Sequence, residues 1–422
     1  MLKEYPEYKE TPAIWIDKIP SSWKSKKVRE LYTERREKVS DKDYEPLSVC
    51  KAGIVPQLED AVKTDNGDNR RLVKKGDFVI NSRSDRKGSS GVSQYDGSVS
   101  LICITLKPIT NENQFFMHYL LRSVPFTEEY YRNGHGLVAD LWTTRYDEMQ
   151  NIFLPIPPIS EQNAIVKYLD FKTKQIDEFV SAKEKEIAKL EELRCTLINT
   201  AVSRGIDNKN FKPSGMDWLP VIPEKWESIN PKGLFALRKQ KALKTDRQLT
   251  ASQHHGVIFQ EDYMAITGNR VVVVMKDFDI LKHVEAGDFV ISMRSFQGGI
   301  EYSENSGSIS SAYVMLKPNP KFVYPKYFKW LFKSNLYITA LQGTSDLVRD
   351  GQALRYANFV KVRLIKVPIE EQKAIADYLD KKTFEIDTLI SSIQKQITLV
   401  KELRTKLIAD VVTGKIDVRG AI

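Results

Sequence analysis

The stretch EEQKAIADYLDKKTFEID (residues 370–387) decides the fold, because nearly the same residues occur earlier as EQNAIVKYLDFKTKQID (residues 161–177). The shared positions lie 210 residues apart, and they include the triplet YLD at 168–170 and again at 378–380. A repeat of this length does not arise by chance. It predicts a chain built from two related halves.

The repeat extends over most of the chain. GDFVINSR (76–83) returns as GDFVISMR (287–294), and IPSSW (19–23) returns as IPEKW (222–226). SVSLICITLKP, which starts at Ser98, returns as SISSAYVMLKP from Ser308. The order of these matches predicts five segments: a domain at 1–157, a long helix at 158–205, a second domain at 206–367, a second long helix at 368–414 and a short tail at 415–422.

The two long segments have the pattern of helices that share a seam. Apolar residues recur every seven positions, a second apolar row accompanies the first, and charged residues fill most other positions. Two helices need this pattern to bury a common interface. Antiparallel pairing of the two helices would relate the domains by a pseudo-twofold axis, and a plain coiled-coil spacer is the alternative. The predicted seam comprises Ile165, Leu169, Ile176, Phe179, Leu190, Leu193 and Leu197 in the first helix, and Ile375, Leu379, Ile386, Leu389, Ile393, Val400, Leu403 and Leu407 in the second.

Each domain mixes short strand patterns with turns. The two GDFVI runs place a Gly-Asp turn before alternating apolar residues, which is typical of a strand. A glycine-rich polar loop follows each run, and then an amphipathic helix, FFMHYLLRS (115–123) or YFKWLFKS (327–334). We therefore expect an α+β fold in which two similar strand-rich domains are separated by two long helices that pair as an antiparallel coiled coil.

The composition is that of a globular protein with an anionic partner. The 422 residues are too many for one core, and 41% hydrophobic residues are too many for a disordered chain. No apolar run is long enough to cross a membrane, and three scattered cysteines fit a reducing cytoplasm. The net charge of +9 makes nucleic acid the leading candidate, although many basic proteins bind none.

Basic clusters in both domains are the candidate DNA contacts. Lys and Arg neutralise phosphates, and Arg and Gln can also bind base edges in the major groove. A solvated surface is the alternative for each cluster, and Arg83 and its repeat Arg294 could equally anchor their loops. The candidates are Arg70, Arg71, Lys74, Lys75, Arg83, Arg86, Lys87 and Arg145 in the first domain, and Lys239, Lys241, Lys244, Arg247, Gln253, Arg294, Gln297 and Arg355 in the second.

The sequence contains no recognisable catalytic motif. It has no G-x-x-x-x-G-K-[ST] phosphate loop, no dinucleotide-binding fingerprint, no C-x-x-C and no N-P-P-[FYW] tetrapeptide. The adjacent His254 and His255 lack a metal-ligand pattern. We therefore expect a non-catalytic protein that holds no metal.

In its plan and its motifs the chain resembles the specificity subunit of type I restriction-modification systems. The resemblance rests on PPISEQNAIVKYLDFKTKQID and VPIEEQKAIADYLDKKTFEID at the helix starts, on the two GDFVI segments, and on the tail LRTKLIADVVTGKIDVRG. It implies two target recognition domains, each reading one half of an asymmetric bipartite site in double-stranded DNA. The helices would set the gap between the half-sites and dock two modification subunits.

The resemblance also implies a cytoplasmic, prokaryotic protein that binds no cofactor itself. S-adenosylmethionine for adenine methylation would belong to the modification subunits, and ATP and Mg for cleavage would belong to restriction subunits. The helix faces around Glu161, Gln162, Lys172 and Asp177, with their repeats, are candidates for subunit docking, or they only cap and solvate the helices.

Two other classes of function are to be weighed. A repeat scaffold could bind two protein partners without reading DNA, and salt-dependent, sequence-selective DNA binding would argue against it. A fused enzyme with its own methyltransferase or nuclease activity is disfavoured by the absent motifs.

Overall fold

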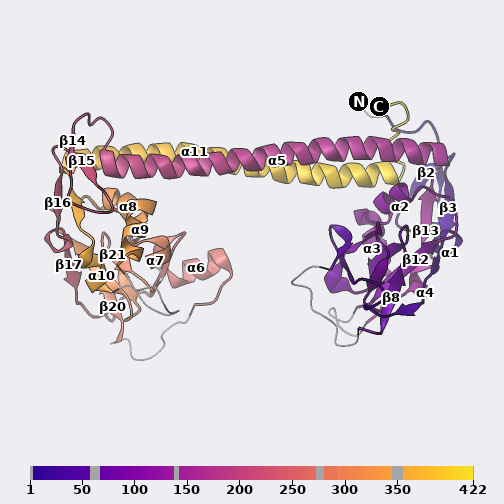
Figure 1. Cartoon of the computed structure of the whole chain (residues 1–422), viewed down its shortest axis with the longest axis horizontal. Helices are drawn as coiled ribbons and strands as arrows, with labels where there is room; N and C mark the ends of the chain where they lie inside the picture. Colours follow the sequence, from indigo (N-terminus) through magenta and orange to yellow (C-terminus); the bar gives the residue numbers. More distant parts are fainter. Residues whose placement is uncertain are drawn as a thin grey trace. The chain divides into compact units, whose positions relative to one another are not determined.

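The computed structural model describes residues 3–57, 67–136, 142–271, 280–293, 295–344 and 355–421. The chain divides into two compact units: unit 1 comprises residues 1–183 and 394–422, and unit 2 comprises residues 184–393. Each unit holds one globular domain and parts of both long helices, α5 (Ile159–Arg204) and α11 (Ile369–Val412) (Figure 1). The five predicted segments follow the order of the chain, whereas the compact units combine distant parts of it.

The globular part of unit 1 is built from short strands with helices between them. Its central sheet has the order β10-β9-β12-β4, and a three-stranded sheet has the order β11-β8-β5. The strands are β1 (Tyr8–Glu10), β2 (Lys18–Pro20), β3 (Lys24–Lys27), β4 (Tyr32–Glu34), β5 (Lys38–Val39), β6 (Leu47–Cys50), β7 (Gly53–Pro56), β8 (Arg70–Val73), β9 (Phe78–Asn81), β10 (Ser90–Val92), β11 (Gly97–Val99), β12 (Cys103–Pro108) and β13 (Phe153–Ile156). The helices are α1 (Val28–Leu31), the short η1 (Ser84–Arg86), α2 (Gln114–Leu120), α3 (Val124–Arg132) and α4 (Tyr146–Met149).

The globular part of unit 2 repeats this plan. Its central sheet, read as β22-β21-β24-β17, matches that of unit 1 strand for strand. The strands are β14 (Phe211–Pro213), β15 (Val221–Pro223), β16 (Glu227–Ile229), β17 (Phe235–Arg238), β18 (Leu249–Ser252), β19 (Gly256–Phe259), β20 (Lys282–Val284), β21 (Phe289–Ile291), β22 (Glu301–Tyr302), β23 (Gly307–Ile309), β24 (Val314–Pro318) and β25 (Leu364–Lys366). The helices are the short η3 (Pro231–Gly233), α6 (Gln260–Thr267), α7 (Ser295–Gly298), α8 (Pro325–Lys333), α9 (Asn335–Gln342) and α10 (Tyr356–Lys361).

The repeated GDFVI segments form the middle of each central sheet. In β9, Phe78 pairs with Leu106 of β12, and in β21, Phe289 pairs with Leu316 of β24. The glycine before each strand has a positive φ, 92° at Gly76 and 96° at Gly287, a conformation that glycine adopts without a steric penalty. The predicted α+β fold with two similar strand-rich domains is confirmed.

Each hydrophobic core includes the ends of both long helices. In unit 1 the core holds Trp23 and the helix residues Leu169 and Val411. In unit 2 it holds Trp226 and the helix residues Val202 and Leu379. The domain of unit 1 therefore packs on the beginning of α5 and the end of α11. The domain of unit 2 packs on the end of α5 and the beginning of α11.

The helices pair antiparallel within each unit. In unit 1 Asp177 of α5 lies 3.7 Å from Arg404 of α11, and in unit 2 Arg194 of α5 lies 3.0 Å from Asp387 of α11. Along α5 the residue number rises between these pairs, and along α11 it falls, as antiparallel pairing requires. The repeat relates Asp177 to Asp387 and Arg194 to Arg404, so both units contain the same ion pair. Within the described ranges, no helix is long and apolar enough to cross a bilayer.

The two rows of the predicted seam differ in burial, and the companion row is largely exposed. Leu169, Leu379 and Ile393 are buried, and Ile176, Leu190, Leu197, Ile386, Val400 and Leu407 are half-buried. By contrast, Phe179, Leu193, Leu389 and Leu403 are between 39% and 57% exposed. Ile165 and Ile375 are buried in the cores that the domains share with the helices.

The true companion row lies one residue later. In α5 it contains Thr173, Val180, Ile187 and Arg194, and in α11 it contains Thr383, Ile390, Ile397 and Arg404, all buried or half-buried. These residues and the apolar row alternate at spacings of three and four, which is the heptad pattern of a two-helix seam. Threonines and arginines interrupt the apolar residues of this row, and the apolar residues one position earlier in the sequence resemble a seam more closely.

The helix-start motif holds each helix to its own domain. Glu161 accepts hydrogen bonds from Tyr5 and Trp23, and Gln162 is fully buried. In the repeat, Glu371 accepts the indole N–H of Trp226 at 2.9 Å, and Gln372 is fully buried. The prediction that the face around Glu161 and Gln162 docks a partner is therefore wrong, since these side chains are enclosed by their own domain. Lys172 is half-buried and Asp177 is exposed.

Candidate nucleic-acid interface

A buried carboxylate frames the predicted DNA-binding loops in each domain. Asp77, from the first GDFVI segment, accepts the backbone N–H of Lys74 at 2.8 Å and forms a double ion pair with Arg35 at 2.7 and 3.2 Å. Asp288 does the same in unit 2, with the backbone N–H of Glu285 and with Arg238. These arginines therefore support the fold. Arg238, which belongs to the basic stretch of the second domain, is not free to contact DNA.

Arg70 is also a structural arginine, which corrects its assignment as a DNA contact. Its side chain is buried, donates to the hydroxyl of Ser98 at 2.8 Å, and donates to the carbonyl oxygen of the same residue at 3.0 Å. Burial lowers the pKa of Arg70. Its position in β8 points the guanidinium inward, because side chains alternate between the two faces of a strand.

The neighbouring candidates in unit 1 meet around a polar cavity. The cavity measures about 450 Å³ and is lined by three predicted contacts, Arg71, Arg83 and Arg145. Arg36, which the sequence did not single out, is the fourth arginine of the lining. Glu34 binds both Arg71 and Arg36. We call this site the arginine cavity.

The remaining candidates of the first domain lie on the surface. Lys74 is 3.2 Å from Asp96, and Lys87 is 2.6 Å from Glu128. Lys75 and Arg86 are exposed. Surface ion pairs of this kind contribute little to stability, so all four side chains can be redirected to phosphates at small cost.

The second domain presents a different basic surface. Lys239, Lys241 and Lys244 are exposed along the segment that follows β17. Arg247 is engaged with its own domain, since it pairs with Glu261 and its guanidinium lies 3.7 Å from the ring centre of Phe259. Gln253, Gln297 and Arg355 are exposed, and Arg294 lies outside the described residues.

Sequence reasoning missed the side chain that positions the polar loops of unit 2. Lys333, at the end of α8, donates to the carbonyl oxygens of Gln253 at 3.3 Å and Gly298 at 2.9 Å, and also binds the buried Glu301. It thus ties the β18–β19 turn to the end of α7, the short helix that contains Gln297. Arg122 holds the corresponding turn in unit 1 through the carbonyl oxygen of Lys51. A basic residue followed by serine ends both amphipathic segments of the repeat, and this pair was the sequence signal for the role of Arg122 and Lys333.

A buried histidine joins two carboxylates at the base of the second basic segment. His283 lies 2.8 Å from Asp246 through Nδ1 and 2.9 Å from Glu285 through Nε2. Burial by itself lowers the pKa of His283, but the two carboxylates outweigh it, so the pKa is raised overall. The neighbouring Lys282 does not compete for these carboxylates, because its ammonium donates to the carbonyl oxygen of Tyr313.

We expect the stability of unit 2 to fall as His283 loses its proton. A raised folded-state pKa means that the stabilisation is fully present below the pKa of the unfolded chain, near 6.5, and is lost as the pH rises through the folded-state value. Chemical denaturation at a series of pH values should show this decline, and the variant His283→Gln should lack it. The same decline in the variant would assign the effect to another group.

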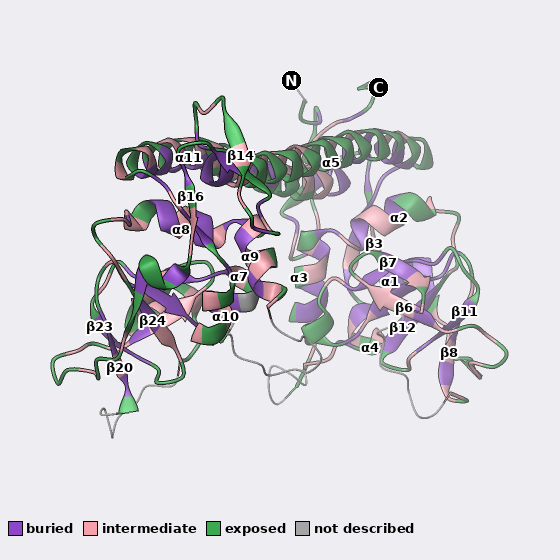
Figure 2. Cartoon of the chain, turned by 60° about the vertical axis from the view of Figure 1, so that its left-hand side comes forward, coloured by how far each residue is buried: buried purple, intermediate pink, exposed green. Residues whose placement is uncertain are grey.

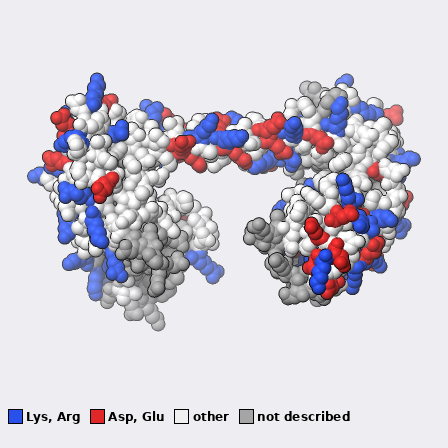
Figure 3. Space-filling view, in the orientation of Figure 1, with Lys and Arg blue, Asp and Glu red and all other residues white. Residues whose placement is uncertain are grey.

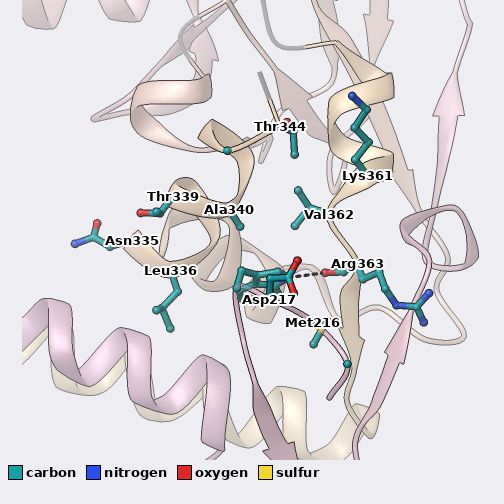
Figure 4. Close-up of a pocket in the computed structure, with 13 residues that line it drawn as sticks. Met216, Asp217, Asn335, Leu336, Thr339, Ala340, Thr344, Lys361, Val362 and Arg363 are labelled. Carbon is teal, nitrogen blue, oxygen red and sulfur yellow. Dashed lines mark hydrogen bonds between the residues drawn. The ribbon is translucent and has the colours of Figure 1, made fainter. Parts of the chain in front are cut away.

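The larger cavity of unit 2 has a different character (Figure 4). It measures about 630 Å³, and its lining includes Leu336 and Ala340 of α9 and the turn that contains Trp218. The indole of Trp218 donates to the carbonyl oxygen of Arg363 at 3.0 Å, and the guanidinium of Arg363 binds Ser228. Of its described lining residues, Lys361 and Arg363 are the basic ones, compared with the four arginines of the arginine cavity.

Comparison with known proteins finds one family to which the chain is similar. The profile of the family "Type I restriction modification DNA specificity domain" matches residues 20–192. The type I restriction enzyme MjaX specificity subunit of Methanocaldococcus jannaschii is 22% identical over 96% of both chains. The MjaVIII specificity subunit of the same organism is 22% identical over 79% of this chain and 78% of that protein.

The chain is thus similar to type I specificity subunits along nearly its whole length. Solved structures share its fold: a chain from a type I restriction-modification system superposes with a TM-score of 0.68, covering 94% of this chain and 99% of that one at 14% identity. The HsdS subunit of Thermoanaerobacter tengcongensis gives a TM-score of 0.54, covering 96% of this chain and 100% of that one at 14% identity.

The two long helices expose apolar side chains at equivalent positions in both units. In unit 1 these are Phe179 and Leu403, and in unit 2 they are Leu193 and Leu389. All four directly precede a companion-row residue of the seam, and in an antiparallel pair such positions lie on the same side of both helices. Figure 2 shows the long helices exposed away from their seam. In Figure 3, Lys and Arg alternate with Asp and Glu along them.

Proposed function

We propose that this chain is the DNA sequence-recognition subunit of a type I restriction-modification complex. Each strand-rich domain reads one half of an asymmetric bipartite site in double-stranded DNA. The observation that carries this proposal is that two domains with the same sheet order present different basic surfaces. The sheet order is the same in both domains, whereas the first domain presents the arginine cavity and the second presents Lys239, Lys241 and Lys244. Domains with the same frame and different contact residues should bind different half-sites.

The long helices set the gap between the half-sites and dock two modification subunits. The support for docking is the exposed apolar pair in each unit, Phe179 with Leu403 and Leu193 with Leu389. An exposed apolar surface on a charged helix marks a protein contact. Because the internal repeat makes the two pairs equivalent, they fit two copies of the same partner.

The chain itself performs no bond chemistry in this proposal. The modification subunits carry S-adenosylmethionine and methylate adenine, and restriction subunits carry ATP and Mg for cleavage. The arrangement separates sequence recognition, which the two domains supply, from catalysis, which the partners supply.

Binding by the purified chain with its modification subunits should test the DNA-reading role. We expect the affinity for a duplex with the bipartite site to exceed that for a scrambled duplex, and to fall steeply with salt as phosphate contacts release counterions. Competition titrations at several salt concentrations measure both properties. Binding that ignores sequence, in a complex with intact modification subunits, would favour a repeat scaffold that holds two partners without reading DNA.

A further inference from the structure

The arginine cavity is formed by two segments that are far apart in the sequence and joined by backbone hydrogen bonds. Ser84 donates its N–H to the carbonyl oxygen of Trp142 at 3.1 Å, and Thr144 donates to Ser82 at 3.0 Å. This pairing brings Arg83 opposite Thr143. Arg145 follows two positions after Thr143 in the same segment. Backbone hydrogen bonds thus hold the two segments that carry Arg83 and Arg145 together. The side chains of both arginines are available for a ligand.

Some arginines of the arginine cavity are paired with carboxylates, and the others are exposed. Glu34 binds Arg36 and Arg71, and Asp147 lies 4.0 Å from Arg36. Arg83 and Arg145 are exposed, and their backbone N–H groups donate to the side chains of Asn81 and Glu148. Among the described residues that line the cavity, four guanidinium groups face two carboxylates, and no ion pair within that part of the chain involves Arg83 or Arg145.

The shape of the cavity favours a chemical group that projects from the surface of the ligand into a recess of the protein. Arg71 forms its inner part, because its side chain is only 16% exposed and is bound to Glu34. Leu101 and Ile102 supply apolar walls. The hydroxyl of Tyr146 is already used, since it donates to the carbonyl oxygen of Tyr32 at 2.9 Å. A base edge in the major groove is read by side chains that protrude into the groove, whereas a recess with excess positive charge receives a phosphate.

We propose that the arginine cavity binds a backbone phosphodiester of the DNA and thereby orients the first domain on its half-site without reading a base. Arg83 and Arg145 supply the charge-assisted hydrogen bonds to the non-bridging oxygens, in the planar geometry that suits a phosphate. Arg71 and Glu34 hold the inner wall in place. The apolar side chains Leu101 and Ile102 lie against the sugar next to that phosphate. This inference rests on the proposed DNA-recognition function.

The double variant Arg83→Gln/Arg145→Gln tests it, in complex with the modification subunits. We expect the affinity to fall about tenfold for the cognate duplex and by a similar factor for a scrambled duplex. The slope of log affinity against log salt should become shallower by about 0.9 for the lost phosphate contact. The control Lys18→Gln/Lys24→Gln removes the same charge from exposed positions outside the cavity, and its slope should match that of the wild type.

A methylphosphonate scan then locates the phosphate. Replacing one phosphate at a time along the duplex should weaken the wild-type complex at one position in the first half-site, and the same replacement should have no effect on the double variant. A loss confined to the cognate duplex with an unchanged salt slope would overturn the proposal, because it would make the arginines base readers. An unchanged affinity for both duplexes, or an equal change in the control, would overturn it as well.

The outcomes separate this inference from the proposed function. A wild-type complex that discriminates between duplexes, with a double variant that behaves identically, contradicts only the phosphate site. A wild-type complex that does not discriminate contradicts the DNA-reading role itself. Thermal unfolding of the double variant, compared with the wild type, checks that the substitutions leave the domain folded.

Discussion

Replacing Gln372 with leucine should destabilise unit 2 by about 3 kcal/mol, because it leaves three buried backbone groups without partners. The amide oxygen of Gln372 accepts the N–H of Tyr324 at 2.7 Å. Its amide nitrogen donates to the carbonyl oxygens of Phe322 and Val367, each at 2.8 Å. The side chain is fully buried, so water cannot replace these bonds. Denaturant unfolding of the variant measures the loss.

A matched control is available on the same helix. Gln394 of α11 is exposed, and Gln394→Leu should change the free energy of unfolding by less than about 0.5 kcal/mol. Gln162→Leu should repeat the effect in unit 1, since Gln162 makes the same kind of contacts with Asn113 and Pro157. Equal effects of the buried and exposed substitutions would show that the helix-start motif does not fasten the helices to the domains.

Lengthening both long helices by one heptad should lengthen the gap between the half-sites while leaving both half-sites unchanged. Seven residues inserted after Ala188 in α5 and seven after Thr398 in α11 keep the heptad seam continuous in both helices. Each insertion adds about 10 Å at 1.5 Å per residue, so the gap should grow by up to about three base pairs. Sequencing of modified bases in cells that carry the variant reads the new motif directly.

An insertion that breaks the heptad is the control for this variant. Five residues added only after Ala188 shift every later seam residue of α5 off its partner, and the thermal stability should fall instead of the gap growing in an orderly way. A heptad variant that is folded and active but keeps the original gap would contradict the role of the helices in spacing.

The architecture was predictable because the chain contains an internal repeat, and repeated segments adopt equivalent structures. The two GDFVI segments and the two helix starts marked equivalent positions, and the structure places them in equivalent strands and helices. The companion row of the seam was harder to predict, because Thr173 and Arg194 interrupt its apolar residues. Threonine can be buried there since its hydroxyl bonds to the backbone of its own helix, as Thr383 does with Leu379 at 2.6 Å.

The candidate interface was predictable only in part. The sequence identified the basic residues, but it could not separate Arg70, which points into the domain, from Arg71, which lines the arginine cavity. Adjacent residues of a strand point to opposite faces, and the register that decides between them comes from pairing with distant strands. Arg36 was missed because it joins the cavity through Glu34 and not through a local motif.

A map of methylated bases across the source genome, with and without this gene, tests the central claim most directly. If the two domains read the two halves of one site, removing the gene should abolish methylation at a single split motif with two different half-sites and a fixed gap. An unchanged map in cells that still express the modification subunit would contradict the claim that this chain directs the complex to its DNA.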